Sequence, residues 1–166
     1  MQMERKTEGL PSITALIVAA GRGQRAGKGL PKQYRPLPQN PDRMILSQTL
    51  KAFMDHDAID RVLVVIHPDD LNLYADAIRE FSENAKLITA VDGGSTRQAS
   101  VQNGLEHLKQ YNPNLVLIHD AARPYVSADL ISNCVKAIAD DETLDGVIPG
   151  LASSDTVKRV ADAKIS

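Results

Sequence analysis

Short apolar runs alternate with amphipathic stretches along most of the chain. The run Ile13 to Ala19 is continuously apolar, which predicts a strand buried on both faces, and the runs at 61–67 and 115–119 read the same way. Weaker runs at 86–91 and 146–149 predict two further strands. Strands that alternate with helices are typical of βαβ units joined by right-handed crossovers. The pattern therefore predicts an α/β fold with a mostly parallel sheet.

Four stretches between these runs carry apolar residues at helical spacing. They predict helices near 45–54, 71–78, 101–108 and 130–138, and Asp69 and Ser127 are the expected N-caps of the second and fourth. The proline-containing stretch 35–44 predicts an extended loop instead of a helix. No strong element is expected in 153–166, so the chain is expected to stop partway through a domain.

Composition narrows the class of protein. The 166 residues carry a net charge of -2 and are 43% hydrophobic, as expected of one soluble domain that binds neither nucleic acid nor membrane. The single cysteine, Cys134, excludes an intrachain disulfide and fits a reducing compartment. Residues 1–12 lack the apolar core of a signal peptide, and no apolar run reaches the ~20 residues of a membrane helix. We expect a cytoplasmic protein with a disordered leader at 1–12 and a nucleotide-binding domain at 13–154.

The loop after the first predicted strand combines glycines with positive charge. Four glycines stand among residues 21–29, and backbone N–H groups at glycine can turn towards a ligand without obstruction by a Cβ atom. Backbone donors and compensating charge together favour a polyphosphate over a merely solvated basic loop. Five cations lie within the fourteen residues from 22 to 35: Arg22, Arg25, Lys28, Lys32 and Arg35.

Two better-known phosphate motifs do not fit this loop. The P-loop pattern fails because Gly29 follows Lys28 where Ser or Thr is required, and because Arg22 takes the place of its first glycine. The dinucleotide fingerprint matches at Gly21, Gly23 and Ala26, but the prolines that follow prevent the helix that it requires. NAD is therefore discounted.

Two later loops also follow predicted strands. Gly93 and Gly94 would let a flat base or sugar lie against the backbone, although a plain turn with Ser95 as N-cap is equally compatible. Asp120 is placed to bind Mg²⁺ or a ribose hydroxyl, unless it only pairs with Arg123 to shape a turn. His119 is given no chemical role.

Read together, these segments resemble the 2-C-methyl-D-erythritol 4-phosphate cytidylyltransferases of the non-mevalonate isoprenoid pathway. The resemblance implies a Rossmann-like three-layer sandwich of the nucleotide-diphospho-sugar transferase type. Its segments occur in family order over nearly the whole chain: AAGRGQR at 19–25, PKQY at 31–34, DGGSTRQASVQNGL at 92–105, HDAARP at 119–124 and DTVK at 155–158.

The resemblance also implies roles for single residues. Arg25 and Lys32 would be catalytic and stabilise the transition state. Asp120 would lie near the Mg²⁺, and Thr156 would approach the partner's acceptor from an arm at 155–166 that swaps across a homodimer. The residues implied to hold CTP are Ala20, Gly21, Gly23, Gly93, Gly94, Ser95, Ser100, Asp120 and Ala121.

The implied reaction transfers CMP from CTP to a small phosphorylated polyol, 2-C-methyl-D-erythritol 4-phosphate. An anionic phosphate nucleophile requires alignment and charge stabilisation rather than a strong base, which agrees with cations as the catalytic candidates. The alternatives are a ribitol-5-phosphate cytidylyltransferase and a catalytically silent nucleotide-binding or dimerisation module. A generic sugar nucleotidyltransferase or a molybdopterin guanylyltransferase fits less well. The family's two acceptor-binding cations near the C-terminus have no counterpart here, and some members carry a fused cyclodiphosphate synthase domain.

Overall fold

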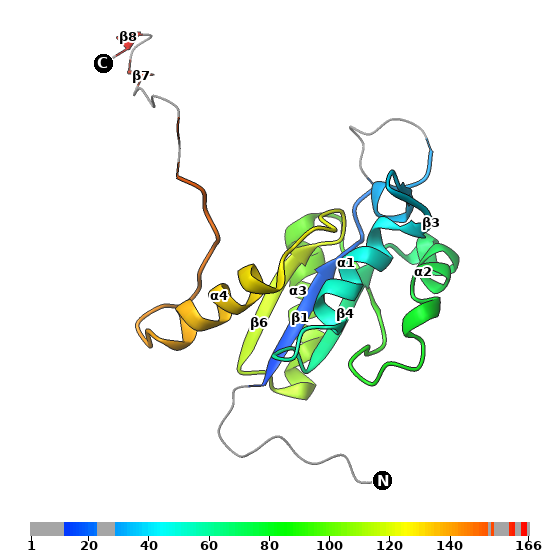
Figure 1. The fold of residues 1–166 in the computed structure, drawn as a ribbon, viewed down its shortest axis with the longest axis horizontal. Helices are drawn as coiled ribbons and strands as arrows, with labels where there is room; N and C mark the ends of the chain where they lie inside the picture. Colours follow the sequence, from blue (N-terminus) through cyan, green and yellow to red (C-terminus); the bar gives the residue numbers. More distant parts are fainter. Residues whose placement is uncertain (1–11, 23–28, 153, 155–159, 162–163, 166) are drawn as a thin grey trace.

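A parallel sheet forms the centre of the molecule (Figure 1). The computed structural model describes residues 12–22, 29–152, 154, 160–161 and 164–165. Within these ranges the main sheet has the order β5-β4-β1-β6, and β1 pairs in parallel with both β4 and β6. The strands are β1 (Ile13–Val18), β4 (Arg61–Ile66), β5 (Val91–Asp92) and β6 (Leu115–Asp120). The predicted parallel α/β sheet is confirmed.

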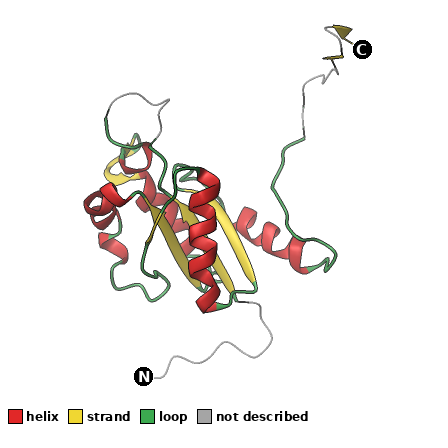
Figure 2. Cartoon of the chain, turned by 180° about the vertical axis from the view of Figure 1, so that it is seen from behind, coloured by secondary structure: helices red, strands yellow, loops and turns green. Residues whose placement is uncertain are grey.

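Helices cover both faces of this sheet. The helices α1 (Ile45–Met54), α2 (Leu71–Ala77) and α4 (Ala128–Ala139) contribute to the apolar cluster on one face. Helix α3 (Arg97–Leu108) covers the opposite face and lies in front of the sheet in Figure 2. This arrangement of helix, sheet and helix confirms the predicted three-layer sandwich.

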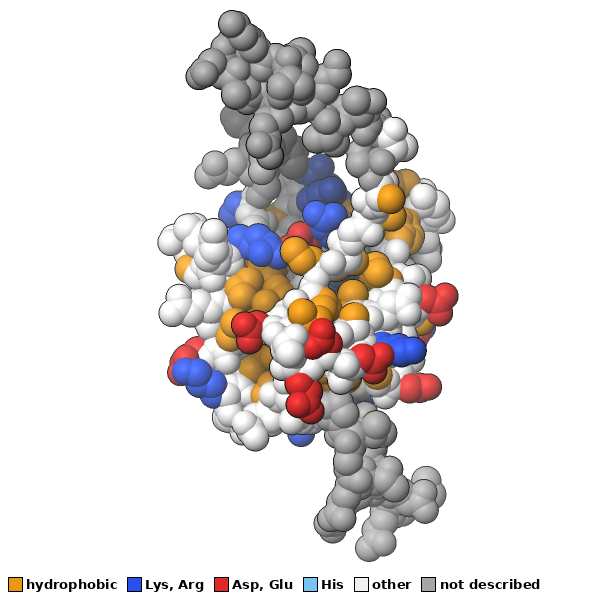
Figure 3. All heavy atoms as spheres, turned by 90° about the vertical axis from the view of Figure 1, so that its left-hand side faces the viewer, with side chains coloured by type: hydrophobic (Ala, Val, Ile, Leu, Met, Phe, Trp, Pro, Cys, Tyr) orange, Lys and Arg blue, Asp and Glu red, His pale blue; other side chains and the backbone are white. Residues whose placement is uncertain are grey.

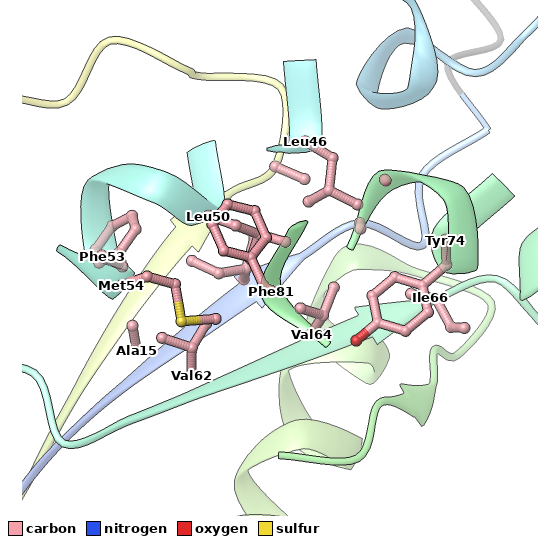
Figure 4. Packing of buried hydrophobic residues seen from close by; sticks show 14 of the residues in the cluster. Ala15, Leu46, Leu50, Phe53, Met54, Val62, Val64, Ile66, Tyr74 and Phe81 are labelled. Atoms are coloured by element: carbon pink, nitrogen blue, oxygen red, sulfur yellow. The ribbon is translucent and has the colours of Figure 1, made fainter. Parts of the chain in front are cut away.

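The strands contribute alternate side chains to two apolar clusters, as the period of a β-strand requires. Ala15 joins Leu50 and Phe53 of α1 in the cluster shown in Figure 4. Leu16 lies in the second cluster, beneath α3. Helix α3 packs closely against the sheet at Gly104. A Cβ atom at this position would lie only 2.4 Å from Cδ1 of Leu16.

Smaller elements connect the layers. The predicted extended stretch 35–44 forms an antiparallel pair, β2 (Pro36–Leu37) and β3 (Asn40–Met44). Four 3₁₀ helices occur among the described residues, and the short strands 160–161 and 164–165 pair antiparallel where no strong element was expected. The 3₁₀ helices are η2 (Lys32–Tyr34), η3 (Pro68–Asp70), η4 (Arg79–Phe81) and η5 (Lys109–Tyr111), and the late strands are β7 (Val160–Ala161) and β8 (Lys164–Ile165).

The prediction of a strand at 146–149 was wrong. No strand forms there, and Ile148 is 94% exposed. The segment contains Gly146, which weakens a strand, and Pro149, which cannot donate a ladder hydrogen bond. The weak run at 86–91 gives only the short β5 and one isolated bridge between Leu87 and Val62.

One of the two predicted N-caps was also wrong. Asp69 does not cap α2, because Pro68 first starts the 3₁₀ turn η3, in which His67 accepts a hydrogen bond from the amide of Asp69. The cap position of α2 falls to Asp70, whose side chain makes no capping bond. Ser127 is confirmed as the cap of α4, since its hydroxyl accepts from the amide of Leu130.

β6 is an edge strand among the described residues, and its side chains are only partly buried. Figure 3 views the side on which β6 and α4 lie in Figure 1, and apolar side chains gather there. Ile118 on β6 is 44% exposed and Leu130 on α4 is 39% exposed. The β6 side of the sheet is therefore more exposed to solvent than the β4 side.

Candidate functional site

Three of the predicted loops leave the sheet at the same level. The parallel hydrogen-bond pattern continues one residue beyond the strands, where the amide of Ala19 donates to Val65 O at 2.7 Å. The amides of Gly93 and Ala121 extend it in the same way, donating to Ile66 O and Val18 O. The loops after β1, β5 and β6 are therefore neighbours at the carboxyl edge, where open α/β sheets bind ligands.

A buried glutamine fixes the predicted catalytic lysine beside the glycine loop. The side-chain amide of Gln33 donates to Ala19 O at 2.6 Å and to Gly21 O at 3.1 Å. Gln33 is only 5% exposed, so these bonds are shielded from water. Lys32, its neighbour in η2, is exposed and forms no ion pair with a described residue. Its ammonium group is thus available to an anion at this edge.

The second glycine pair is required by packing. A Cβ atom at Gly93 would lie 2.3 Å from Cβ of Ala20 and 2.9 Å from Oγ of Ser100. Ser100 is buried, and its hydroxyl accepts from the amide of Gly94 at 3.1 Å while donating to Thr96 O at 2.9 Å. The loop after β5 is therefore pressed against the loop after β1, which brings these predicted CTP-binding residues together.

Helix α3 begins beside this glycine pair. Thr96, rather than Ser95, is its N-cap, and its hydroxyl accepts from the amide of Ala99 at 3.0 Å. The N-terminus of a helix carries a partial positive charge that favours anions. Arg97, the first residue of α3, adds a full charge at the same place. Ser95 itself is exposed at the entrance to the helix.

Asp120 lies between two arginines from different elements. Its Oδ1 accepts from Nε of Arg97 at 3.0 Å, and its Oδ2 accepts from Nε of Arg123 at 3.1 Å. Burial alone would raise the pKa of Asp120, but hydrogen bonds and charges from Arg123 and Arg97 outweigh it and hold the pKa below its ordinary value. The carboxylate is therefore ionised at neutral pH and orients both guanidinium groups.

Asp120 is the carboxylate that the sequence predicted to bind Mg²⁺ at the carboxyl edge. No group of three or more His, Cys, Asp or Glu side chains that could hold a metal occurs among the described residues. Arginine nitrogens already surround the carboxylate of Asp120: Oδ1 lies 3.0 Å from Nε and 2.9 Å from Nη2 of Arg97, and Oδ2 lies 3.1 Å from Nε of Arg123. Mg²⁺ commonly binds through one or two carboxylates together with substrate phosphates, so an ion held by Asp120 alone would need phosphate oxygens as further ligands.

Two of the five cations expected to form a phosphate clamp are engaged elsewhere. Arg22 binds Asp69 at 2.8 Å and Asp70 at 3.1 Å, beyond the end of β4. Arg35 donates through Nε to Leu30 O at 2.8 Å. Arg22 is therefore paired with carboxylates, Arg35 keeps its charge while its Nε binds a carbonyl, and Lys32 is exposed, whereas Arg25 and Lys28 lie outside the described residues.

Three predicted site residues lie outside the described residues: Gly23, Arg25 and Thr156. Of the others, Asp120 ends β6, Lys32 begins η2, Ser100 lies in the first turn of α3, and the rest lie on the loops at the carboxyl edge. Arg97 and Gln33 had no predicted role, yet Arg97 bonds to Asp120 and Gln33 to Gly21. No spacing rule marks either residue, because each acts across elements that are distant in sequence.

His119 makes packing and hydrogen-bond contacts, which agrees with the absence of a predicted chemical role for it. Its ring packs against Phe53 with the ring centroids 5.0 Å apart, and its Nε2 lies 2.9 Å from Arg123 O.

A separate polar hollow of about 680 Å³ lies between β3 and α2. It contains none of the predicted site residues, and Arg43 and Glu80 in its lining pair with each other at 2.8 Å.

The sequence matches characterised families over most of its length. Residues 13–166 match the family model described as IspD, 2-C-methyl-D-erythritol 4-phosphate cytidylyltransferase. A bifunctional enzyme IspD/IspF of Brucella anthropi is 46% identical over 163 residues, which cover 97% of this chain and 38% of that protein. The bifunctional enzyme of Rhodospirillum rubrum is also 46% identical, over 94% of this chain and 38% of its own length. The chain thus spans less than two-fifths of these relatives.

Solved structures agree with the sequence comparison. The 4-diphosphocytidyl-2C-methyl-D-erythritol synthase of Anaerococcus prevotii superimposes with a TM-score of 0.72 at 27% identity, covering 95% of this chain and 64% of that one. The 2-C-methyl-D-erythritol 4-phosphate cytidylyltransferase of Francisella tularensis gives 0.64 at 28% identity, covering 93% and 64%. In the described part of the chain, no helix has the length and apolar character needed to cross a membrane.

Proposed function

The chain belongs to the 2-C-methyl-D-erythritol 4-phosphate cytidylyltransferase family, and we propose that it transfers CMP from CTP to 2-C-methyl-D-erythritol 4-phosphate in isoprenoid precursor biosynthesis. One structural observation supports this proposal. The glycine loops after β1 and β5, the exposed Lys32 and the ionised Asp120 belong to one edge of the sheet. Such an edge provides backbone donors, a cation and a metal ligand, which a nucleoside triphosphate requires.

The proposed step is an in-line displacement. A phosphate oxygen of the acceptor forms a bond to the α-phosphorus of CTP, and the bond from that phosphorus to the bridging oxygen breaks, so that pyrophosphate leaves with its electron pair. The nucleophile is already an anion, and negative charge grows on the α-phosphate oxygens. Arg25 and Lys32 would stabilise that charge, which makes alignment and electrostatics the main source of rate.

The nucleotide would lie along the two glycine loops. Backbone groups of Ala20, Gly21, Gly23, Gly93 and Gly94 would hold CTP, together with Ser95 and Ala121. Ser100 would act through the loop, since its hydroxyl already binds the amide of Gly94. Asp120 would lie near the ribose and would hold Mg²⁺ alongside the phosphate oxygens. The ion supplies charge neutralisation at the phosphates when it is bound.

The remaining parts of the proposal concern organisation. Residues 1–12 would be a leader, 13–154 the nucleotide-binding domain, and 155–166 the start of an arm that swaps across a homodimer. Thr156 on that arm would approach the acceptor bound by the partner. The protein would act in the cytoplasm.

Pyrophosphate release from CTP, Mg²⁺ and each acceptor tests the proposed activity. We expect release with 2-C-methyl-D-erythritol 4-phosphate and not with ribitol 5-phosphate, an acceptor that the comparisons disfavour. Substituting Lys32 by Ala should lower kcat by ~10²–10³, as loss of a preorganised transition-state donor does. Unchanged turnover in the Lys32→Ala variant would remove this residue from the mechanism.

Binding must be measured separately from chemistry. At 100 times its dissociation constant, CTP should stabilise the fold by about 2.7 kcal/mol and raise the melting temperature. A chain that is stabilised by CTP but releases no pyrophosphate with either acceptor would be the silent nucleotide-binding module. A chain that CTP does not stabilise would contradict the proposal itself.

A further inference from the structure

The side-chain amide of Gln33 takes the place of a strand where β4 ends. The ladder between β1 and β4 is extended by the amide of Ala19, which donates to Val65 O at 2.7 Å. In a parallel register the amide of His67 would donate next to Ala19 O, but β4 ends at Ile66. Among the described residues, that oxygen accepts instead from Nε2 of Gln33 at 2.6 Å. A side chain thus continues the hydrogen bonding of the sheet.

The same nitrogen also binds the next part of the loop. Nε2 of Gln33 lies 3.1 Å from Gly21 O, so its two hydrogens serve the carbonyls of Ala19 and Gly21. Only the nitrogen end of a glutamine side chain can donate, and two carbonyl acceptors therefore settle which end faces the loop. Because Gln33 is buried, these bonds are made in a medium in which hydrogen bonds are stronger than in water.

These two bonds set the direction of two backbone donors. Across a planar trans peptide, the N–H of one residue points opposite to the C=O of the residue before it, and no described peptide bond is cis. The carbonyls of Ala19 and Gly21 are turned towards Gln33. The amides of Ala20 and Arg22 therefore both point away from Gln33, towards the same side of the loop.

The side that the Ala20 amide faces is that of β6. Hydrogen-bonding groups point to alternate sides of a strand, and the carbonyl of Val18 accepts from the amide of Ala121, which follows β6. In a longer ladder Ala20 would donate to Ala121 O, but that oxygen accepts from the hydroxyl of Thr49 at 2.8 Å. The amides of Ala20 and Arg22 donate to no described residue. Since Ala20 is only 9% exposed, its amide has little access to water, which leaves a ligand at this edge as its expected partner.

We propose that Gln33 is a positioning residue for the CTP site: its side-chain amide holds two carbonyls of the loop after β1, so that the amides of Ala20 and Arg22 are presented to the nucleotide. Gln33 directly follows Lys32, so the same bonds place the lysine relative to these amides. The functional part of this inference rests on the proposed binding of CTP at this edge. The mechanical part, that one side chain orients the loop, concerns the free protein.

The variant Gln33→Met tests the mechanical part. Methionine keeps the length and bulk of the side chain but has no donor. In the free protein, the carbonyl carbon NMR resonances of Ala19 and Gly21 should both move upfield in this variant, because each carbonyl loses a hydrogen bond. If either resonance stays in place, Gln33 does not hold the loop through both carbonyls and the inference is overturned.

CTP affinity, measured by calorimetry, tests the functional part. Gln33→Met should weaken CTP binding by about tenfold, because the amides of Ala20 and Arg22 lose their fixed direction. Ser47→Ala is the matched control, since Ser47 is also 5% exposed and its hydroxyl donates to Ala77 O at 2.7 Å, beside the polar hollow that contains no predicted site residue. Both variants should lower the melting temperature, but Ser47→Ala should change CTP affinity by less than about twofold. Equal losses of affinity in the two variants, or none in Gln33→Met, would contradict the inference.

The variant Gln33→Glu adds a rescue that a purely structural role would not give. An ionised glutamate presents only acceptors to the two carbonyls, whereas a protonated one can donate to one of them. Relative to the unsubstituted chain at the same pH, the CTP affinity of Gln33→Glu should recover as the pH is lowered, and that of Gln33→Met should not. Recovery in both variants, or in neither, would count against the inference. If the unsubstituted chain binds no CTP, the proposed function fails, while the carbonyl resonances still decide whether Gln33 orients the loop.

Discussion

Asp120 shows how one side chain can serve both structure and chemistry. Arg97 comes from the first turn of α3 and Arg123 from the loop after β6, and both bind the same carboxylate. The pair of guanidinium groups would otherwise repel each other at the carboxyl edge. Asp120 therefore keeps two cations beside the proposed phosphate site.

The charge of Asp120 should appear in the pH dependence of stability. Its pKa is lower in the folded chain than in the unfolded chain, so its contribution to stability is fully present above the unfolded value of about 3.9 and is lost as pH falls through the folded pKa. At pH 7 the Asp120→Asn variant should have the smaller free energy of unfolding. Below about pH 4 the gap should narrow, which denaturant titrations at several pH values would measure. A gap that widens on acidification would contradict the sign.

Gly21 and Gly93 should respond differently to the same substitution. In Gly93→Ala the new methyl group meets Ala20 at 2.3 Å, so overpacking should cost ~1–3 kcal/mol of stability. In Gly21→Ala the new methyl group meets no atom of a described residue within 4 Å, so stability should change by less than about 0.5 kcal/mol. If the backbone at Gly21 approaches the nucleotide, CTP affinity should nevertheless fall in Gly21→Ala. Denaturant titration and calorimetry on both variants would separate the two effects, and unchanged affinity in Gly21→Ala would remove that contact.

At the scale of elements, the N-termini of α3 and α4 are both capped by a side-chain hydroxyl, but among the described residues only the N-terminus of α3 is bonded to the proposed CTP site. Ser127 caps α4 on the open side of the sheet, and Thr96 caps α3 beside Gly94. The first turn of α3 also carries Ser100, whose hydroxyl is shared between Gly94 and Thr96. The start of α3 is thus bonded to the glycine loop, whereas the start of α4 forms no bond with a predicted site residue that the structure describes.

The two caps give a matched pair of variants. Ser127→Ala and Thr96→Ala should each reduce the free energy of unfolding by about 1 kcal/mol, the usual cost of losing a capping hydroxyl. Only Thr96→Ala should also weaken CTP binding, because it loosens the turn that holds the Gly94 amide. Equal loss of CTP affinity in both variants would mean that the effect comes from general destabilisation.

At the scale of the whole molecule, local hydrophobic patterns predicted the strands and helices of the three layers, but not which strands pair or which side chains meet at the ends of the sheet. The apolar run at Ile13–Val18 predicted a central strand because burial on both faces removes the need for polar alternation. The segment 146–149 also contains adjacent apolar residues, but Gly146 and Pro149 flank them, and it pairs with no described strand. Asp69 and Asp70 are indistinguishable in sequence, yet one is exposed and the other buried. The same limit hid the contacts of Asp120 with Arg97 and of Gln33 with Ala19, which depend on strand order.

The open edge at β6 and the proposed arm offer two different routes to self-association. Ile118 is 44% exposed on an edge strand, and a lysine at an edge prevents pairing between sheets. If the homodimer forms through residues 155–166, the Ile118→Lys variant should remain a dimer in sedimentation equilibrium, and a chain ending at Ser154 should be a monomer. Association through the sheet edge reverses both results, because the shortened chain keeps β6 while Ile118→Lys does not keep an apolar edge. Both variants should still be stabilised by CTP, since neither change touches the loops after β1 and β5.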